Sequence, residues 1–342
     1  MKFDFVIGNP PYQDEAIGDN RTFAPPIYHT FLDGAFQVSK TAILVHPARF
    51  LFDAGSTPHE WNRKMLADPH FKVLHYESDA SKFFPNTEIK GGVAISYHDE
   101  AQNFGAIEIF TPYPELNDIL HKVQHAHFKS LSKIVFTAYS YHLTEQLHLD
   151  HPEAANLLSA GHAFDIKSNT LERLPGIFLA DRPDDGHAYV RVFGRIGTTR
   201  VYRFLRRDYV NRPKNLDKWK VFVPKSNGSF AFDILSTPIV ASPEVGHTET
   251  FMSIGCFDTE DEAKACLKYI CTKFARALLG VLKVTQDNPP EKWKYVPLQD
   301  FTSASDIDWS QPVAGIDRQL YEKYGLTAEE IAFVETHVRE ME

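Results

Sequence analysis

FDFVIGNPPYQ, residues 3–13, joins a short apolar run to a stiff turn. The run from Phe3 to Ile7 predicts a buried β-strand that ends at Gly8. The two prolines that follow make a rigid, extended segment, because proline fixes φ and has no amide hydrogen. The carbonyl oxygens of this turn are therefore expected to remain available as hydrogen-bond acceptors.

The residues of the turn suit a planar amine. Asn9 places a side-chain carbonyl beside the carbonyl of Pro10, and Tyr12 offers an aromatic face. Two such acceptors take the two hydrogens of an amino group while the ring stacks on the plane that carries it. Because asparagine does not ionise, the turn predicts positioning of a weakly nucleophilic nitrogen toward an electrophile, and not acid–base catalysis.

A strand followed by Asn-Pro-Pro-Tyr resembles the catalytic loop of S-adenosylmethionine-dependent amino-methyltransferases. The resemblance is to the adenine-specific (N6) DNA methyltransferases of restriction-modification systems in particular, including type II enzymes fused to a nuclease. It implies four catalytic residues, Asn9, Pro10, Pro11 and Tyr12. A second Asn-Pro-Pro, at residues 288–290, follows a helical pattern and has Glu291 where the aromatic should be, so we interpret it as a turn.

The next hundred residues predict strands that alternate with helices. Residues 25–38 carry a helical apolar stripe, and strands are expected at 42–45, 71–78 and 93–97. This alternation predicts an α/β fold with a parallel sheet that ends in a hairpin. The order resembles the second half of the methyltransferase catalytic domain, so we expect a partial Rossmann-like sheet within residues 1–112.

An aromatic residue in a late loop has a role in the methyltransferase family, where it covers the second face of the flipped base. Phe84, directly before Pro85, occupies the matching position. The resemblance therefore implies that a flipped adenine lies between Tyr12 and Phe84. The alternative is that Phe83 and Phe84 belong to the hydrophobic core, where aromatic residues are common.

The methyl donor has no recognisable site in this sequence. In the family, S-adenosylmethionine is bound by a glycine-rich turn and an acidic residue that precede the Asn-Pro-Pro-Tyr strand. The glycines of residues 192–200 have the wrong spacing, and we interpret them as turn residues. We therefore expect a donor site mostly outside this chain, as in a fragment of a larger polypeptide or one subunit of a split enzyme. The strand from Phe3 to Ile7 would then present an unpaired edge for a partner strand or for self-association.

Composition sets the broad class. The 342 residues are 43% hydrophobic and 24% charged, which predicts a sizeable core and about two domains. No window resembles a signal peptide or a membrane helix, so we expect a soluble, cytoplasmic protein without a membrane partner. Cys256, Cys266 and Cys271 lack metal-ligand spacing and are expected to be free thiols.

Metal binding and nuclease activity are not expected of this chain. Its 16 histidines have no accompanying frame of cysteines or carboxylates, so no metal site is predicted. Asp79 with Glu88 and Lys90 imitates the acidic and lysine set of metal-dependent endonucleases. That set overlaps the base-covering loop, and we expect any linked nuclease to lie elsewhere in a larger protein.

Positive charge is concentrated in one segment. Residues 191–225 hold eleven Lys or Arg and two acidic residues, a net charge of +9, whereas the rest of the chain carries −18. Such segregation is typical of a surface that follows DNA phosphates, and aromatic residues are interleaved with the cations. The alternative is a solvated strand face with the aromatics in the core. The candidate DNA-binding residues are Arg195, Arg200, Arg203, Arg206, Arg207, Lys220 and Lys225.

The position of this segment agrees with DNA recognition. In the methylase family a target-recognition domain follows the catalytic domain, and residues 113–310 resemble one of α+β class. A helix is expected to begin at Thr259, with Glu262 completing a capping box, and to end at Gly280. Residues 311–342 are expected to form a helical tail, with a second capping box at Thr327.

These features predict site-specific DNA adenine methylation within a restriction-modification system. The chain would supply the base pocket and the recognition of double-stranded DNA, and a missing methyltransferase or nuclease portion, or a partner subunit, would supply the donor site. Two alternatives remain open. One is a DNA-binding specificity module without catalysis, and the other is a protein glutamine methyltransferase, since related enzymes hold a glutamine amide with the same acceptors.

Overall fold

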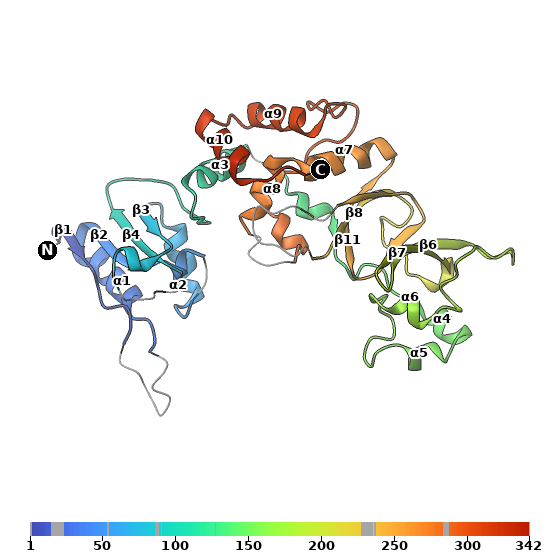
Figure 1. Cartoon of the computed structure of the whole chain (residues 1–342). Coiled ribbons are helices and arrows are strands. Elements are labelled where there is room, and N and C mark those ends of the chain that lie inside the picture. Colours follow the sequence, from blue (N-terminus) through green and yellow to red (C-terminus); the bar gives the residue numbers. More distant parts are fainter. Residues whose placement is uncertain are drawn as a thin grey trace. The chain divides into compact units, whose positions relative to one another are not determined.

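The chain folds into two compact units with several β-sheets, residues 1–117 and 118–342 (Figure 1). The class is mixed α/β, as predicted. The boundary falls within helix α3 (Pro114–His125). The computed structural model describes residues 2–14, 24–52, 55–85, 89, 91–126, 128–226, 235, 237–282 and 287–341.

A four-stranded sheet forms the centre of the first unit. Its strands lie in the order β1-β2-β4-β3, with β1 (Phe3–Gly8), β2 (Ser39–Pro47), β3 (Phe71–Glu77) and β4 (Val93–Asp99). Strand β1 pairs with β2 in parallel, and β4 is antiparallel to both of its neighbours. The expected strands are present, and β3 and β4 form the expected hairpin. The sheet is mixed and not parallel as predicted, because only β1 and β2 run in parallel.

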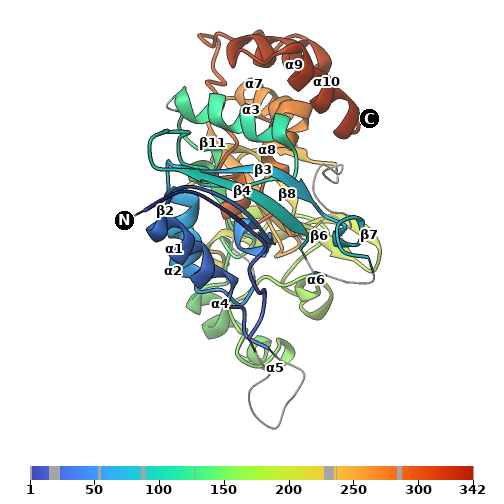
Figure 2. The same ribbon diagram turned by 90° about the vertical axis from the view of Figure 1, so that its left-hand side faces the viewer.

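Helices cover one face of this sheet. Helix α1 (Tyr28–Val38) connects the parallel strands, and α2 (His59–Ala67) follows the short 3₁₀ helix η1 (Arg49–Phe52). Figure 2 shows α1 and α2 on the same side of the sheet. Leu32 of α1 and Leu44 of β2 are buried together in a core that also holds Phe50, Trp61 and Phe71.

Strand β1 is not buried, contrary to the prediction. The side chains of Phe3, Phe5 and Ile7 are 68%, 70% and 78% exposed. Successive side chains of a strand point to opposite faces, so Val6 packs toward the core while these three occupy the other face. Because β1 is an edge strand with β2 on one side, the described residues leave both its apolar face and its outer edge open.

Two smaller sheets form the second unit. One has the order β10-β6-β7 and the other β5-β11-β8-β9. Phe193, Phe222 and Phe251 lie together in a cluster that joins the two sheets. The strands are β5 (Val135–Phe136), β6 (Tyr189–Ile196), β7 (Thr199–Arg206), β8 (Trp219–Pro224), β9 (Ile239–Ala241), β10 (Val245–His247) and β11 (Phe251–Phe257).

Short helices complete the core next to β6 and β7. Leu147 and Leu171, from two of these helices, share a buried cluster with Val190, Val192 and Leu205 of the two strands. The helices of this region are α4 (Glu145–Asp150), α5 (Ala154–Leu157) and α6 (Thr170–Arg173). Two 3₁₀ helices, η3 (Leu131–Ile134) and η4 (Arg207–Tyr209), precede β5 and follow β7.

The helix expected from Thr259 to Gly280 is two helices, α7 (Glu260–Cys271) and α8 (Lys273–Gly280). Thr272 breaks it in an extended conformation, with ψ 149°, and its side chain accepts the N–H of Ala275. The carboxylate of Asp317 accepts the N–H groups of Lys273 and Phe274 at 3.0 and 2.9 Å. These bonds satisfy the first N–H groups of α8, which a helix cannot satisfy by itself.

The last helices pack within the second unit. Helix α9 (Val313–Lys323) contacts both α7 and α8, and α10 (Ala328–His337) contacts α8. The capping box predicted at Thr327 and Glu330 is confirmed. Among the described residues, no helix combines the length and the apolar character that a membrane span requires.

Candidate functional site

The Asn-Pro-Pro-Tyr loop leaves the carboxyl end of β1, where Gly8 pairs with Leu44 of β2. Its far end is fixed to the segment before α1, because the N–H of Ile27 donates to the carbonyl of Tyr12 at 3.2 Å. Asn9 is exposed, and no described backbone N–H donates to the carbonyl of Pro10. The two expected acceptors therefore lie on a loop that is held at both ends.

Tyr12 and Phe84 come from distant parts of the chain and contact each other. Their ring centroids are 6.2 Å apart and the ring planes are nearly perpendicular, at 83°. Burial raises the pKa of Tyr12 to about 12, and the nearby Asn9 side chain lowers it by a smaller amount. The Tyr12 hydroxyl forms no hydrogen bond with the described residues. The hydroxyl of Tyr12 is thus neutral at physiological pH.

A base does not fit between these rings as they stand. An adenine stacked on both faces needs parallel rings about 7–8 Å apart, twice the contact distance of about 3.5–4.0 Å. The observed rings are closer and nearly perpendicular. Phe84 follows the 3₁₀ helix η2 (Ala80–Lys82) and is partly exposed, so it is the ring that a base would have to displace.

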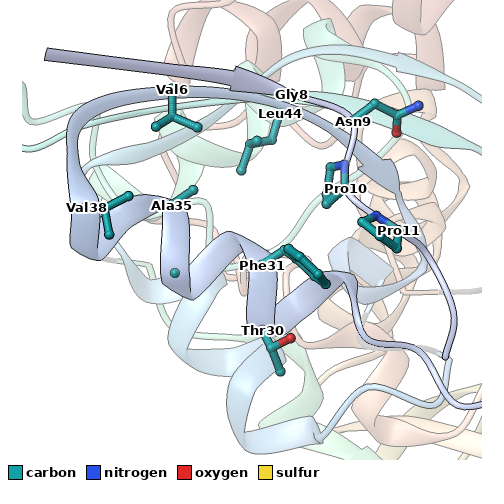
Figure 3. A pocket seen from close by; sticks show the side chains of 11 residues that line it. Val6, Gly8, Asn9, Pro10, Pro11, Thr30, Phe31, Ala35, Val38 and Leu44 are labelled. Carbon is teal, nitrogen blue, oxygen red and sulfur yellow. The ribbon is translucent and has the colours of Figure 1, made fainter. Parts of the chain in front are cut away.

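An apolar cavity of about 590 Å³ lies beside the loop (Figure 3). Figure 3 shows Phe31 and Thr30 of α1 facing the loop across this cavity, while the amide of Asn9 points away from it. The lining residues are Val6, Gly8, Asn9, Pro10, Pro11, Thr30, Phe31, Gly34, Ala35, Val38 and Leu44.

This cavity does not fit S-adenosylmethionine. The cofactor carries an ammonium, a carboxylate and ribose hydroxyls, which require charged or strongly polar partners. The side chains that line the cavity include no acidic and no basic residue. The residues that line this cavity therefore do not offer the partners that the cofactor needs.

The basic segment is less uniform than its sequence indicates. Arg195 and Arg200 are exposed and lie opposite each other on β6 and β7. Arg203 is partly exposed and donates to the carbonyl of Tyr202. Lys225 is partly exposed and donates to the hydroxyl of Tyr139 at 3.2 Å.

Arg206 and Arg207 are engaged in ion pairs within the second unit. The Arg206 guanidinium lies over the ring of Tyr209 and binds Asp208 through two bonds of 2.6 Å and Asp150 at 2.8 Å. Arg207 pairs with Asp217 and with Glu244. Carboxylates of the same unit therefore already pair with both guanidinium groups, which makes these two arginines weaker candidates for DNA contact than the sequence indicated.

Lys220 is wrong as a DNA contact. The side chain is fully buried, and its ammonium donates to the backbone carbonyls of Leu216, Lys218 and Ser242 at 3.0–3.1 Å. Burial lowers its pKa to about 7. A phosphate cannot reach this group, because all three donors are used inside the protein.

Comparisons with known proteins point to methylases. Residues 1–84 match the Eco57I restriction-modification methylase family. An uncharacterized adenine-specific methylase of Mycoplasma pneumoniae is 32% identical over 95 residues, which cover 27% of this chain and 22% of that protein. The predicted resemblance to adenine-specific methylases of restriction-modification systems is confirmed. The matched segment contains the Asn9 loop and ends at Phe84, so both parts of the predicted base pocket lie inside it.

A solved structure, that of the type IIG restriction endonuclease BpuSI, covers 90% of this chain and 48% of its own. The two chains are 11% identical with a TM-score of 0.33, which is too low to show that they share a fold. This chain therefore spans about a fifth of the curated methylase and about half of the solved structure.

The second Asn-Pro-Pro has a different setting. Asn288 is fully buried, and its carbonyl accepts from the indole of Trp293, the last residue of the 3₁₀ helix η5 (Pro290–Trp293). It lies within the second unit between Asp287, which forms an isolated β-bridge with Ser226, and the 3₁₀ helix, so the interpretation as a structural turn agrees with the structure.

The structure describes the nuclease-like set of residues only in part. Asp79 caps η2 by accepting from Ser81, while Glu88 and Lys90 lie outside the described residues. Within the described ranges, no cluster of three His, Cys, Asp or Glu side chains is placed to hold a metal ion. Cys256 is exposed, and Cys266 and Cys271 are buried, all as free thiols.

Two features next to the loop were not predicted from the sequence. Phe31 and Val38 of α1 are each 45% exposed and line the cavity. The open face of β1 was also not predicted. The polar Asp4 between Phe3 and Phe5 is a signal for it, because polar and apolar residues alternate in a strand whose two faces differ.

Proposed function

We propose that this chain supplies the base-binding loop of an adenine-N6 DNA methyltransferase in a restriction-modification system. The observation that carries the proposal is the exposed Asn9 at the carboxyl end of β1, followed by the rigid Pro10-Pro11 turn. Ligands of open α/β sheets bind at the carboxyl ends of the strands. The similarity to restriction-modification methylases over residues 1–84 supports the same conclusion.

The loop would act on the exocyclic nitrogen of adenine by positioning it. The Asn9 side-chain oxygen and the Pro10 carbonyl accept its two hydrogens, which favours the positive charge that develops on the nitrogen during methyl transfer. Tyr12 stacks on the base, and Phe84 moves from its edge contact to cover the second face. Because the base must leave the duplex to reach this loop, the reaction requires base flipping.

The open edge of β1 is proposed to receive the donor-binding portion. Unpaired backbone groups of an edge strand readily pair with another strand, and the apolar face formed by Phe3, Phe5 and Ile7 adds area to bury. A strand paired there would end next to Asn9. S-adenosylmethionine would then be held by residues other than those that line the apolar cavity.

The second unit is proposed to recognise the DNA. Its candidate contacts are Arg195, Arg200, Arg203 and Lys225, since the other cations predicted from the sequence are paired with carboxylates or buried. A basic surface in the unit that follows the loop is what a target-recognition role requires.

Replacing Asn9 with Ala tests the proposed chemistry. The removal of one acceptor from the nitrogen is expected to slow methylation about 10²- to 10³-fold. N6-methyladenine is mapped by single-molecule sequencing in the host organism that carries the substitution, which requires no knowledge of the target site. Asn288→Ala is the matched control, because it makes the same change in the second Asn-Pro-Pro, which forms a structural turn.

Persistence of the methylation pattern in the Asn9→Ala strain would overturn the proposal. Loss of a methylated glutamine in a host protein, without any change in DNA methylation, would favour the protein-directed alternative. Loss of DNA methylation with Asn9→Ala and retention with Asn288→Ala is the result that supports a catalytic loop.

A further inference from the structure

Strands β6 and β7 form a two-stranded ribbon with eight paired positions, from Tyr189 opposite Arg206 to Ile196 opposite Thr199. Two residues, Gly197 and Thr198, close the ribbon. Gly197 has φ +58°, which the first loop position of a type II′ turn requires. The carboxylate of Glu172 accepts the N–H of Gly197, which fixes the turn to helix α6.

Arg195 and Arg200 are direct neighbours across this ribbon, one pair from the turn. Phe204 exchanges two backbone hydrogen bonds of 2.8 Å with Leu179 on the outer side of β7. Arg200 has the same parity along the strand, so its own backbone groups also face outward. The pair of arginines is therefore a non-hydrogen-bonded pair, in which the Cα atoms are about 4.5 Å apart and the side chains are closest.

Two like charges placed directly opposite destabilise a ribbon. Neither guanidinium forms an ion pair with any carboxylate in the part of the chain that the structure describes, and Arg200 lies over the ring of Phe251 at 5.4 Å. By contrast, Arg206 and Arg207 of the same segment are neutralised by four carboxylates. The unrelieved charge at the turn end of the ribbon calls for an anionic or strongly accepting ligand.

We propose that the β6–β7 ribbon enters the major groove of DNA and that Arg195 and Arg200 read guanines in neighbouring base pairs. This inference rests on the recognition role proposed for the second unit. The major groove is about 12 Å wide and admits a two-stranded ribbon. The planar fork of each arginine matches the O6 and N7 acceptors of guanine, and a separation of about 4.5 Å at the Cα atoms suits steps of about 3.4 Å along the duplex.

The geometry of the ribbon favours duplex DNA over duplex RNA. The major groove of an RNA duplex is deep and narrow, so side chains on a ribbon do not reach its base edges. Phosphate contact alone would not need arginine, because a lysine ammonium serves as well for a point charge. A charge-conserving exchange therefore separates the reading of bases from attraction to phosphates.

The experiment selects binding sites from a randomised DNA duplex library with the full chain and sequences them. We expect wild type to enrich a motif that contains two adjacent guanine positions. The variant Arg195→Lys with Arg200→Lys keeps the charge but loses the forks, so discrimination at each of these positions should fall about 5- to 150-fold. The other positions of the motif should be retained. Arg318→Lys, an exposed arginine of α9, is the matched control and should leave the motif unchanged.

An unchanged motif in the double lysine variant would overturn the inference, because the arginines would then contact phosphates at most. A wild-type chain that enriches no motif, or that binds an RNA duplex as tightly as DNA, would also overturn it. These outcomes are read from binding alone. They remain distinct from a failure of the Asn9 chemistry, which the host methylation map reports independently.

Discussion

The two units use the same residue types in opposite ways. The first unit leaves Asn9, Phe5 and other side chains of β1 and its loop in solvent. The second unit buries Asn288 and Trp293 completely and encloses even the ammonium of Lys220. Burial of a polar group is costly unless its hydrogen bonds are made, and exposure of large apolar groups is costly unless something covers them.

The comparison separates residues that stabilise the fold from residues that are available to a ligand. Asn-Pro-Pro occurs in both units, and the tripeptide alone does not decide its use. After a strand at an open sheet edge it presents acceptors to solvent, whereas beside a buried tryptophan it closes a turn. The context of a motif, rather than the motif, carries the function.

The largest expected effect concerns the aromatic residues that differ most in burial. Trp293→Ala should lower the free energy of unfolding of the second unit by about 3–5 kcal/mol, because it empties a fully buried site. Phe5→Ala should change the stability of the first unit by less than about 0.5 kcal/mol. Urea denaturation with probes on each unit measures both values.

Phe5 should instead affect assembly. If the open face of β1 receives the donor-binding portion, Phe5→Asp lowers DNA methylation in the host while the urea midpoint of the isolated chain stays unchanged. Leu149→Asp, at a leucine of α4 with 75% exposure, is the control and should leave methylation intact.

For the stability comparison, a first unit that unfolds with Phe5→Ala as readily as the second unit does with Trp293→Ala would abolish the contrast between the units.

A smaller effect is expected from the two asparagines. Asn288→Ala removes a fully buried amide and should destabilise the second unit by about 1–3 kcal/mol. Asn9→Ala removes an exposed side chain and should leave the thermal midpoint within about one degree, since surface changes are usually near neutral. Differential scanning calorimetry of the two variants makes the comparison, and equal midpoints would show that both copies serve the same purpose.

Local sequence patterns were sufficient for most of the first unit. Short apolar runs predicted β1 to β4, helical spacing predicted α1, and the Asn-Pro-Pro-Tyr motif located the candidate loop. Long-range partners were beyond such patterns. Helix α7 ends at Cys271, and Asp317, far along the chain, caps the helix that follows. The exposure of β1 depends on which strands flank it, which its own residues do not specify.

The charged segment shows the same limit for the candidate site. Counting residues predicted one basic surface, but Asp150, Glu244 and Asp258 from other parts of the chain neutralise Arg206, Arg207 and Lys218. Lys220 lies in a strand that is otherwise apolar, and this pattern indicates burial. A count of charges alone does not detect it. The proximity of Tyr12 and Phe84 agrees with the family resemblance, whereas their edge-to-face geometry had no signal in the sequence.

A pH dependence of stability is expected from Lys220. Its pKa is about 7 in the folded state because of burial, whereas the unfolded chain holds the proton to an ordinary lysine pKa of about 10.4. Between these values the unfolded state binds more protons, so the free energy of unfolding rises with pH, by at most about 1.4 kcal/mol per pH unit. Below pH 7 both states are protonated, and Lys220 contributes no slope.

Lys220→Met should remove this rise, whatever it does to the absolute stability through the loss of three carbonyl partners. Urea denaturation of the second unit at several values between pH 7 and 9 gives the slope. Lys225→Met is the control, because its hydrogen bond to Tyr139 raises the pKa of Lys225 and places its titration above that window. A wild-type slope that survives in Lys220→Met would show that other groups cause it and that the pKa of Lys220 is not lowered by burial. The contrast between a unit that encloses its polar groups and one that presents them would then rest on the asparagines and aromatic residues alone.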